Sequence, residues 1–220
     1  LNDKKLIDNL DNIIKEANEA GVSKIIVSGY DKESSLQAIA IANEYESVYA
    51  SIGIHPTDVK DIDDDLNWLI EGLKEPKVVA IGEIGLDYYW DKSFKEKQIE
   101  YFNKQIEIAL KYNYPIVIHS RDAAQDTFEM IAGRGLRGVM HCYAYSYEMA
   151  IRFIKEGFLI GIGGVVTFKN AGLKEVVRNL DLKHLMTETD APYLAPTPFR
   201  GKTNYPKYTV YVVQEIARIK

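Results

Sequence analysis

The chain has 220 residues, of which 46% are hydrophobic and 27% are charged, and its formal net charge is −5. This length and apolar content suffice for one well-packed core, and the acidic balance excludes a protein coated in basic surface for bulk nucleic-acid binding. The single cysteine excludes an intramolecular disulfide and favours a reducing, cytoplasmic location. No apolar run approaches the roughly 20 residues of a membrane span, and the first residues lack the pattern of a signal peptide.

Helix and strand patterns alternate along the whole chain. Apolar residues at helical spacing precede Gly21, which has the position of a helix-terminating glycine. A capping-box pattern at Ser93 and Glu96 predicts the start of another helix. Short apolar runs predict seven buried strands, which cover residues 24–28, 48–54, 78–81, 116–118, 138–140, 158–162 and 184–187. Eight amphipathic helices are expected around them, the last near residues 212–219.

This alternation predicts an α/β fold with a parallel sheet and right-handed crossovers. Eight strands would close a (β/α)8 barrel of the TIM type. Because the sequence opens on a helix, we expect the first strand of such a barrel to lie before Leu1. The length also falls short of the about 250 residues typical of these barrels, so a seven-stranded or open doubly wound sheet is the alternative. No linker interrupts the sequence, and we expect a single domain over residues 1–220.

Four of the predicted strands lead into residues that can bind a metal ion, namely Glu83, His119, His141 and Asp190. In a closed barrel the carboxyl ends of the strands converge on one mouth. Imidazole and carboxylate ligands suit zinc, manganese or a similar divalent ion, and a carboxylate shared by two ions suits hydrolysis. Each residue alone has a structural interpretation, such as a hydrogen-bonded core histidine or a turn-forming aspartate. Their joint placement is what indicates a metal site.

Six short motifs follow one another along nearly the whole chain, at residues 53–56, 82–87, 119–122, 140–142, 163–170 and 188–196. In this order they closely resemble the motifs of the TatD-type metal-dependent deoxyribonucleases, which belong to the wider amidohydrolase group of barrels. The resemblance implies a (β/α)8 barrel, two divalent metal ions (zinc, magnesium or manganese) and hydrolysis of the phosphodiester bonds of DNA, often from the 3′ end. It implies DNA as the partner, single-stranded or at 3′ ends, with no membrane and no obligate protein partner.

The resemblance also implies roles for individual residues. Glu83 corresponds to the carboxylate shared by both ions, and His119 and His141 correspond to ligands of the second ion. Asp190 corresponds to a ligand of the first ion and to the catalytic group that accepts a proton from the attacking water.

Three further residues are implied to face the substrate phosphate, namely His55, Arg121 and Arg200.

The chain departs from the family pattern in three places. The opening His-x-His of the family is absent before Leu1, Tyr143–Tyr145 replaces Phe-Ser-Gly, and Tyr205 replaces a glutamate.

Two other functions remain open at this stage. The same metal chemistry can attack a carboxylic ester or amide, such as a misacylated tRNA, because pocket shape decides the substrate. A non-catalytic binding module would account for the missing His-x-His. Finally, Tyr88, Tyr89 and Trp90 follow the Glu83 motif at the mouth, where they either stack on unpaired bases or pack the loop against the barrel.

Overall fold

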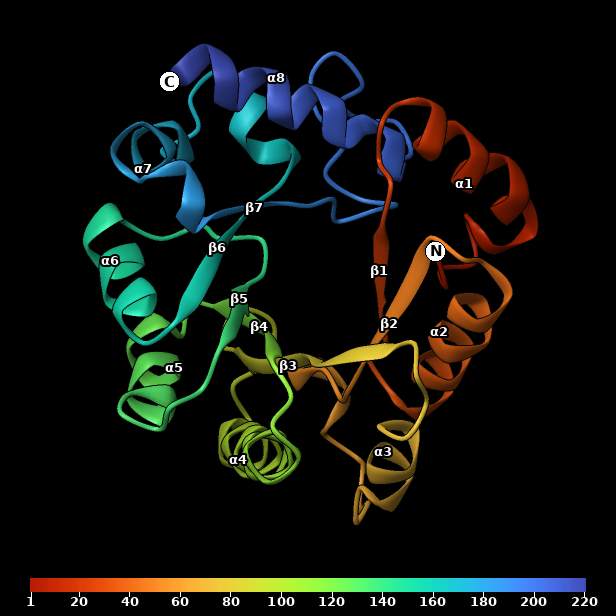
Figure 1. Ribbon diagram of the computed structural model, residues 1–220. Coiled ribbons are helices and arrows are strands. Elements are labelled where there is room, and N and C mark those ends of the chain that lie inside the picture. The colour runs from red at the N-terminus through yellow and green to blue at the C-terminus, as the bar shows by residue number, and fades with distance from the viewer.

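A computed structural model describes all residues from Leu1 to Lys220. Seven strands form a single sheet in the order in which they occur in the chain, and every neighbouring pair is parallel. The strands are β1 (Ile25–Ser28), β2 (Val48–Ile52), β3 (Val78–Asp87), β4 (Ile116–Arg121), β5 (Gly138–Met140), β6 (Phe158–Ile162) and β7 (Leu185–Thr187). The sheet curls around a central axis and the helices lie on its outer side (Figure 1).

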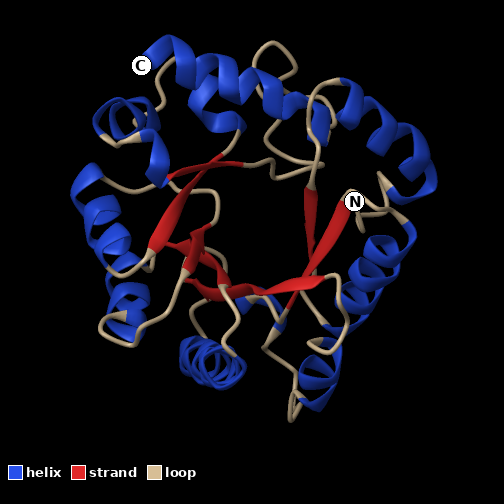
Figure 2. Ribbon diagram, viewed as in Figure 1, coloured by secondary structure: helices blue, strands red, loops and turns tan.

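The sheet does not close, because β1 and β7 are its two edges and are not paired with each other. The sequential strand order and the ring of helices outside the strands are those of a TIM-type barrel (Figure 2). The predicted barrel architecture with seven strands is therefore confirmed. A doubly wound sheet, which carries helices on both faces, is excluded.

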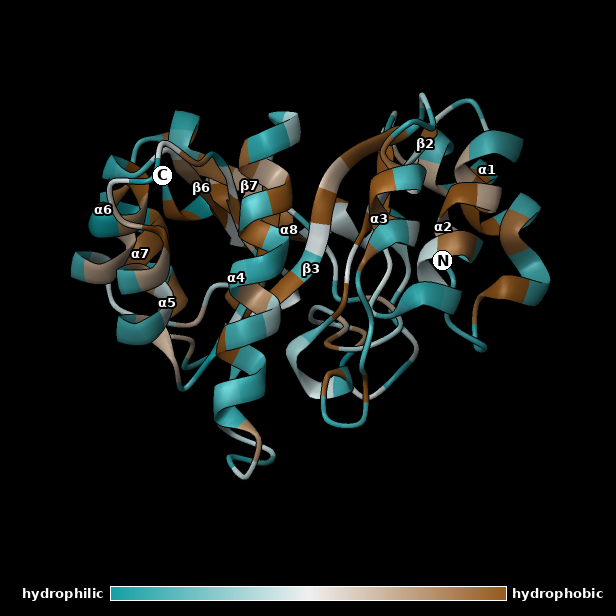
Figure 3. Ribbon diagram, turned by 90° about the horizontal axis from the view of Figure 1, so that it is seen from below, coloured by the Kyte–Doolittle hydropathy of each residue, from teal (hydrophilic) through white to brown (hydrophobic).

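Each helix packs an apolar face against the strands. The helices are α1 (Leu10–Glu19), α2 (Lys32–Glu44), α3 (Asn67–Gly72), α4 (Lys95–Tyr112), α5 (Ala124–Ile131), α6 (Tyr147–Lys155), α7 (Leu173–Asn179) and α8 (Thr209–Ile219). In α1 the buried residues recur at helical spacing, and Gly21 follows the helix with a φ of +91°. Figure 3 shows mostly hydrophilic residues on the outward side of α4 and hydrophobic residues along β6. No helix combines the length and the apolar character that a membrane span requires.

The predicted capping box at Ser93 and Glu96 is wrong. The helix begins at Lys95, its N-cap is Phe94, and no side chain caps it. Asp91 instead accepts a hydrogen bond of 2.8 Å from the backbone N–H of Ser93, which forms a local turn two residues before the helix. The sequence pattern therefore marked the loop before α4 and not its first turn.

The third strand is longer than its apolar run. The prediction placed Glu83 where this strand ends, but β3 continues to Asp87. Its pairing with β4 shifts register between Ile81 and Ile84 and then resumes, with Gly85 opposite His119. Gly85 has a φ of +144°, and a Cβ there would overlap the carbonyl oxygen of His119. Only glycine allows the two backbones to approach this closely and carry the strand on.

This close approach predicts that Gly85→Ala destabilises the protein strongly, by at least about 2 kcal/mol, because the new Cβ meets rigid backbone in a disfavoured conformation. The free energy of unfolding in urea measures the effect. Gly172→Ala is the matched control, since Gly172 has an ordinary φ and no atom near its Cβ position. Equal stability of the two variants would contradict the structural role of Gly85.

Candidate metal centre

The carboxylate of Glu83 lies among three histidines. Its Oε1 is 3.0 Å from His119 Nδ1 and 3.8 Å from His55 Nε2. Its Oε2 is 3.8 Å from Nε2 of His141. The two oxygens of one carboxylate therefore face different histidines, which is the arrangement expected of a carboxylate shared between two ligand sets.

Parallel strands bring these residues together from distant parts of the chain. His119 lies in β4, next to β3, and His141 directly follows β5. Asp190 follows β7 by a few residues and presents its Oδ1 at 3.5 Å from His141 Nε2. The Asp190 side chain is 39% exposed, whereas Glu83 and the three histidines are each less than 20% exposed. The centre thus has a buried side at Glu83 and an open side at Asp190.

His55 lies within the donor group and not beside it. His55, Glu83 and His119 each offer a ligand atom, and these atoms lie within 4.8 Å of one another. The ring of His55 is held by Thr57, whose Oγ1 is 2.7 Å from Nδ1, so that Nε2 faces Glu83. The resemblance placed His55 at the substrate phosphate, whereas this geometry makes it a further candidate for a metal ligand.

A second carboxylate lies behind each of the histidines His119 and His141. Asp87 Oδ2 is 2.9 Å from His119 Nε2, and Glu188 Oε2 is 2.7 Å from His141 Nδ1. The other oxygen of Glu188 accepts a hydrogen bond of 2.7 Å from the backbone N–H of Cys142. Carboxylates in such positions fix the orientation of metal-binding histidines.

Neither Asp87 nor Glu188 was predicted from the sequence to take part in the centre. Both stand at even spacing from a candidate ligand, Asp87 four residues after Glu83 and Glu188 two before Asp190. Residues four apart along a strand share a face, so the spacing from Glu83 was a usable signal for Asp87. Glu188 and Asp190 lie beyond the end of β7, where this rule does not apply.

The charges at the centre are strongly coupled. Burial opposes charge on Glu83, but His141, His119 and His55 outweigh it and hold the pKa of the Glu83 carboxyl well below its usual range. Burial likewise opposes charge on His119, but hydrogen bonds to Asp87 and Glu83 raise its pKa to about 9. The pKa of His141 is raised well above normal by Glu188 and Glu83, against the effect of burial. Burial and the neighbouring His119 lower the pKa of His55 to about 4.

This donor set fits a divalent cation. It combines imidazole nitrogens with ionised carboxylates, the ligands that suit zinc and manganese. Without a cation, two histidines must carry protons to balance the buried carboxylates. A divalent metal ion supplies the same charge as those two protons and takes their place at the histidine nitrogens.

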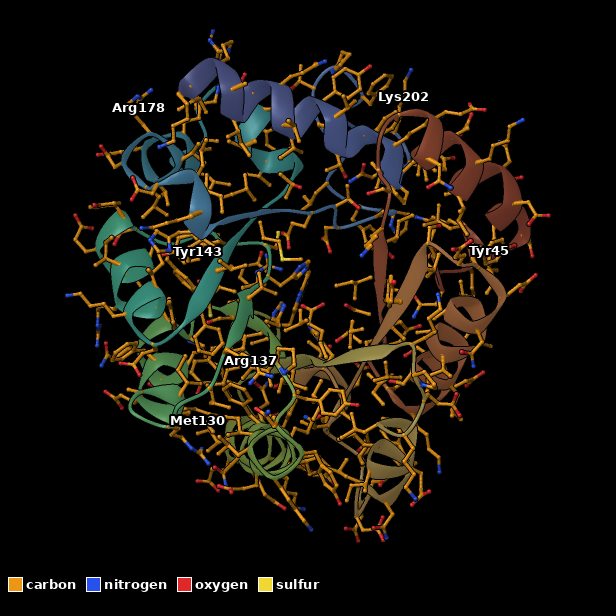
Figure 4. The ribbon with its side chains drawn as sticks, viewed as in Figure 1. Tyr45, Met130, Arg137, Tyr143, Arg178 and Lys202 are labelled. Atoms are coloured by element: carbon orange, nitrogen blue, oxygen red, sulfur yellow. The ribbon has the colours of Figure 1, made fainter.

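The two candidate arginines lie outside this group. Arg121 ends β4 and stacks on Tyr89, with its Cζ 3.7 Å from the ring centroid. Arg200 lies in the loop between β7 and α8, with its Cζ 4.1 Å from the centroid of Phe168. It lines a pocket of about 370 Å³ together with Lys5 and Lys202. Lys202 is labelled in Figure 4 on this loop, near α1.

Comparison with known proteins gives a consistent result. Residues 1–220 match the family model described as TatD related DNase. YabD of Bacillus subtilis (strain 168), named an uncharacterized metal-dependent hydrolase, is 44% identical over 225 residues, which cover 100% of this chain and 88% of that protein. The crystal structure of YjjV, a TatD homolog from Escherichia coli K12, is 32% identical with a TM-score of 0.92, and the match covers 96% of this chain and 84% of that one. A TatD family hydrolase from Entamoeba histolytica is 27% identical with a TM-score of 0.84, over 96% of this chain and 83% of its own.

The position of Glu188 predicts that Glu188→Gln weakens metal binding by about 10- to 100-fold, because the amide cannot hold the His141 ring as the carboxylate does. Titration of the metal-free protein against a chelating dye measures the affinity, and circular dichroism checks the fold. Glu175→Gln, at the surface on α7, is the control and leaves the affinity unchanged. Equal metal affinities of Glu188→Gln and Glu175→Gln would show that Glu188 does not support the metal centre.

The raised pKa of His119 predicts that metal binding releases protons. At pH 7.5 a group with a pKa of about 9 is protonated in the metal-free protein and must lose that proton to become a ligand. The calorimetric heat of zinc binding therefore varies with the ionisation enthalpy of the buffer, and affinity rises as the pH approaches 9. A heat that is the same in phosphate and Tris buffers would contradict this protonation state.

Proposed function

The chain belongs to the TatD-related DNase family of metal-dependent hydrolases, and on this basis we propose that it hydrolyses the phosphodiester bonds of DNA. The observation that carries the proposal is the Glu83 carboxylate, whose two oxygens face different histidines at the open end of the barrel. A phosphodiester is an anion, and attack on it adds further negative charge. Catalysis therefore needs concentrated positive charge, which this donor set is suited to hold.

We assign two divalent ions, of zinc, magnesium or manganese, to Glu83, His119, His141 and Asp190. His55 is a further candidate ligand, because its Nε2 faces Glu83. When bound, such ions supply Lewis-acid stabilisation of the phosphoryl charge and lower the pKa of water. Asp87 and Glu188 orient the two histidines and accept their outer N–H groups.

We assign to Asp190 the role of accepting the proton of the attacking water. Its carboxylate is partly exposed, so that water reaches it, and it lies 3.5 Å from His141 at the rim of the buried centre. A carboxylate is a modest base, but it suffices for a water whose own pKa is lowered. Glu83, by contrast, is buried and surrounded by histidines, which makes it a ligand and not a base.

The cations around the mouth account for binding of the DNA backbone. Arg121 and Arg200 are each stacked on an aromatic ring and form no ion pair within the chain. Lys5 and Lys202 share the pocket of Arg200, which has no carboxylate in its lining. Free guanidinium and ammonium groups in such positions pair with phosphates. We propose single-stranded DNA or DNA ends as the substrate, in line with the family to which the chain belongs.

This assignment predicts that Asp190→Asn lowers the rate of DNA hydrolysis by about 10²–10⁴-fold, the usual contribution of a general base. Cleavage of a 3′-labelled oligonucleotide measures it, with metal content determined on the same preparation. The chelated wild-type protein is the negative control. Near-normal turnover with full metal occupancy would show that another group takes the proton. Hydrolysis of esters or aminoacyl-tRNA without cleavage of DNA would overturn the substrate assignment itself.

A further inference from the structure

We propose that Tyr89, Trp90 and Arg121 form a platform on which an unpaired nucleic-acid base stacks beside the metal centre. The proposal rests on the function proposed above and names a binding site for the strand that lies outside the donor group. The three residues are called the aromatic platform below.

The exposed fractions of the three aromatic side chains after β3 distinguish the two rings of the aromatic platform from a ring that only packs the loop. Three aromatic residues stand in succession after β3, and the first, Tyr88, is only 6% exposed. Its hydroxyl donates to Asp126 at 2.8 Å, so Tyr88 fastens the loop to α5. Tyr89 and Trp90 are 53% and 69% exposed. Packing of the loop against the barrel therefore accounts for Tyr88 but leaves the other two rings facing water.

The geometry of the exposed rings suits a flat, anionic ligand. Tyr89 and Trp90 meet edge to face, with ring centroids 4.9 Å apart and planes at 86°. The Arg121 guanidinium lies over Tyr89 at 3.7 Å and is 5.3 Å from the Trp90 centroid. An aromatic face gives a base a stacking surface, and a stacked guanidinium offers both a further flat face and a charge for the adjoining phosphate.

The buried carboxylate of Asp87, which is 1% exposed, ties the aromatic platform to the metal centre. Its Oδ1 accepts hydrogen bonds from the backbone N–H groups of Tyr89 and Trp90, at 2.9 and 3.3 Å. Its Oδ2 lies 2.9 Å from His119. One side chain therefore positions both the candidate ligand and the backbone of the two exposed rings.

The strand geometry places the aromatic platform on the same side of the sheet as the centre. His119 and Arg121 are two residues apart in β4, so their side chains leave the same face about 7 Å apart. A nucleotide next to the one at the centre can therefore reach Arg121 and the rings beside it.

The aromatic platform selects single strands over duplexes. In a duplex the faces of the bases are already stacked on their neighbours, and only an unpaired base can offer a face to Tyr89 or Trp90. Every base has such a face, so the site discriminates by strandedness and hardly by sequence.

Binding of a fluorescein-labelled oligothymidylate to the chelated protein, followed by anisotropy, tests the site without cleavage. We expect Tyr89→Ala and Trp90→Ala to weaken binding by about 5- to 150-fold, the range for loss of one stacked base. Trp90→Phe keeps a ring and should restore most of the affinity. The matched control is Tyr112→Ala, since Tyr112 is 39% exposed beside Lys111 at the far end of α4 and should have no effect.

Tryptophan fluorescence provides a direct readout of stacking. In a Trp68→Phe background Trp90 is the only tryptophan, and single-stranded DNA should quench it while a blunt hairpin of equal charge should not. Unchanged affinity in both alanine variants, or no quenching, or equal quenching by the hairpin, would overturn the proposal.

The same variants distinguish this proposal from the proposed function. With metal present and the DNA concentration varied up to saturation, Tyr89→Ala should raise the KM and leave the kcat nearly unchanged. The substitution removes a contact that binds DNA but no group that takes part in the chemical step. If the wild-type protein fails to cleave DNA but binds it through Tyr89 and Trp90, the phosphodiesterase assignment fails and the aromatic platform stands. If the wild-type protein cleaves DNA and the alanine variants have normal KM values, the proposed base stacking on the aromatic platform is wrong, and the proposed phosphodiester hydrolysis is retained.

Discussion

The structure depends on the buried charge of Glu83. A carboxylate taken out of water must be matched by positive charge and by hydrogen bonds, or it gives up its own charge. His119 and His141 supply that match, and each is in turn held by a carboxylate, Asp87 or Glu188. The sign of the charge thus alternates outward, from the negative Glu83 to two positive histidines and then to two negative outer carboxylates. Because these groups come from β3, β4 and the segments that directly follow β5 and β7, the network also joins both halves of the sheet.

The long third strand makes this network possible. Were β3 to end at its apolar run, Glu83 would stand at the mouth and Asp87 would lie in a loop. The register shift before Ile84, followed by renewed pairing at Gly85 and Asp87, places one carboxylate of β3 on each side of the position opposite His119. Glu83 then faces one nitrogen of the ring and Asp87 faces the other. The glycine that permits the close approach to β4 is therefore as necessary to the centre as the donors themselves.

Much of this arrangement could be predicted from the sequence, and the part that could not has a physical reason. Alternating helical and apolar patterns predicted the seven strands and brought Glu83, His119 and His141 to the same edge of the sheet, although β3 and β4 continue beyond Glu83 and His119. The extension of β3 was missed because residues 82–87 owe their strand conformation to pairing with β4 and not to local propensity. The position of His55 inside the donor group was missed for a similar reason, since its ring direction is set by Thr57 in a short 3-10 turn. The difference in burial between Tyr88 and Tyr89 depends on Asp126, which accepts a hydrogen bond from the Tyr88 hydroxyl and lies 38 residues further along the chain.

The charge distribution reconciles an acidic chain with the polyanionic DNA substrate that we propose. The centre holds four carboxylates, from Glu83, Asp87, Glu188 and Asp190, against two histidines with raised pKa values, so the protein groups alone repel a phosphate. Attraction must come from divalent cations at the centre and from the unpaired Lys5, Arg121, Arg200 and Lys202 around it. Both sources are local, and neither needs a net positive charge on the molecule. A chain of charge −5 does not steer DNA over long range. Binding of the proposed DNA strand would therefore depend on these few cations and on stacking, which salt does not screen.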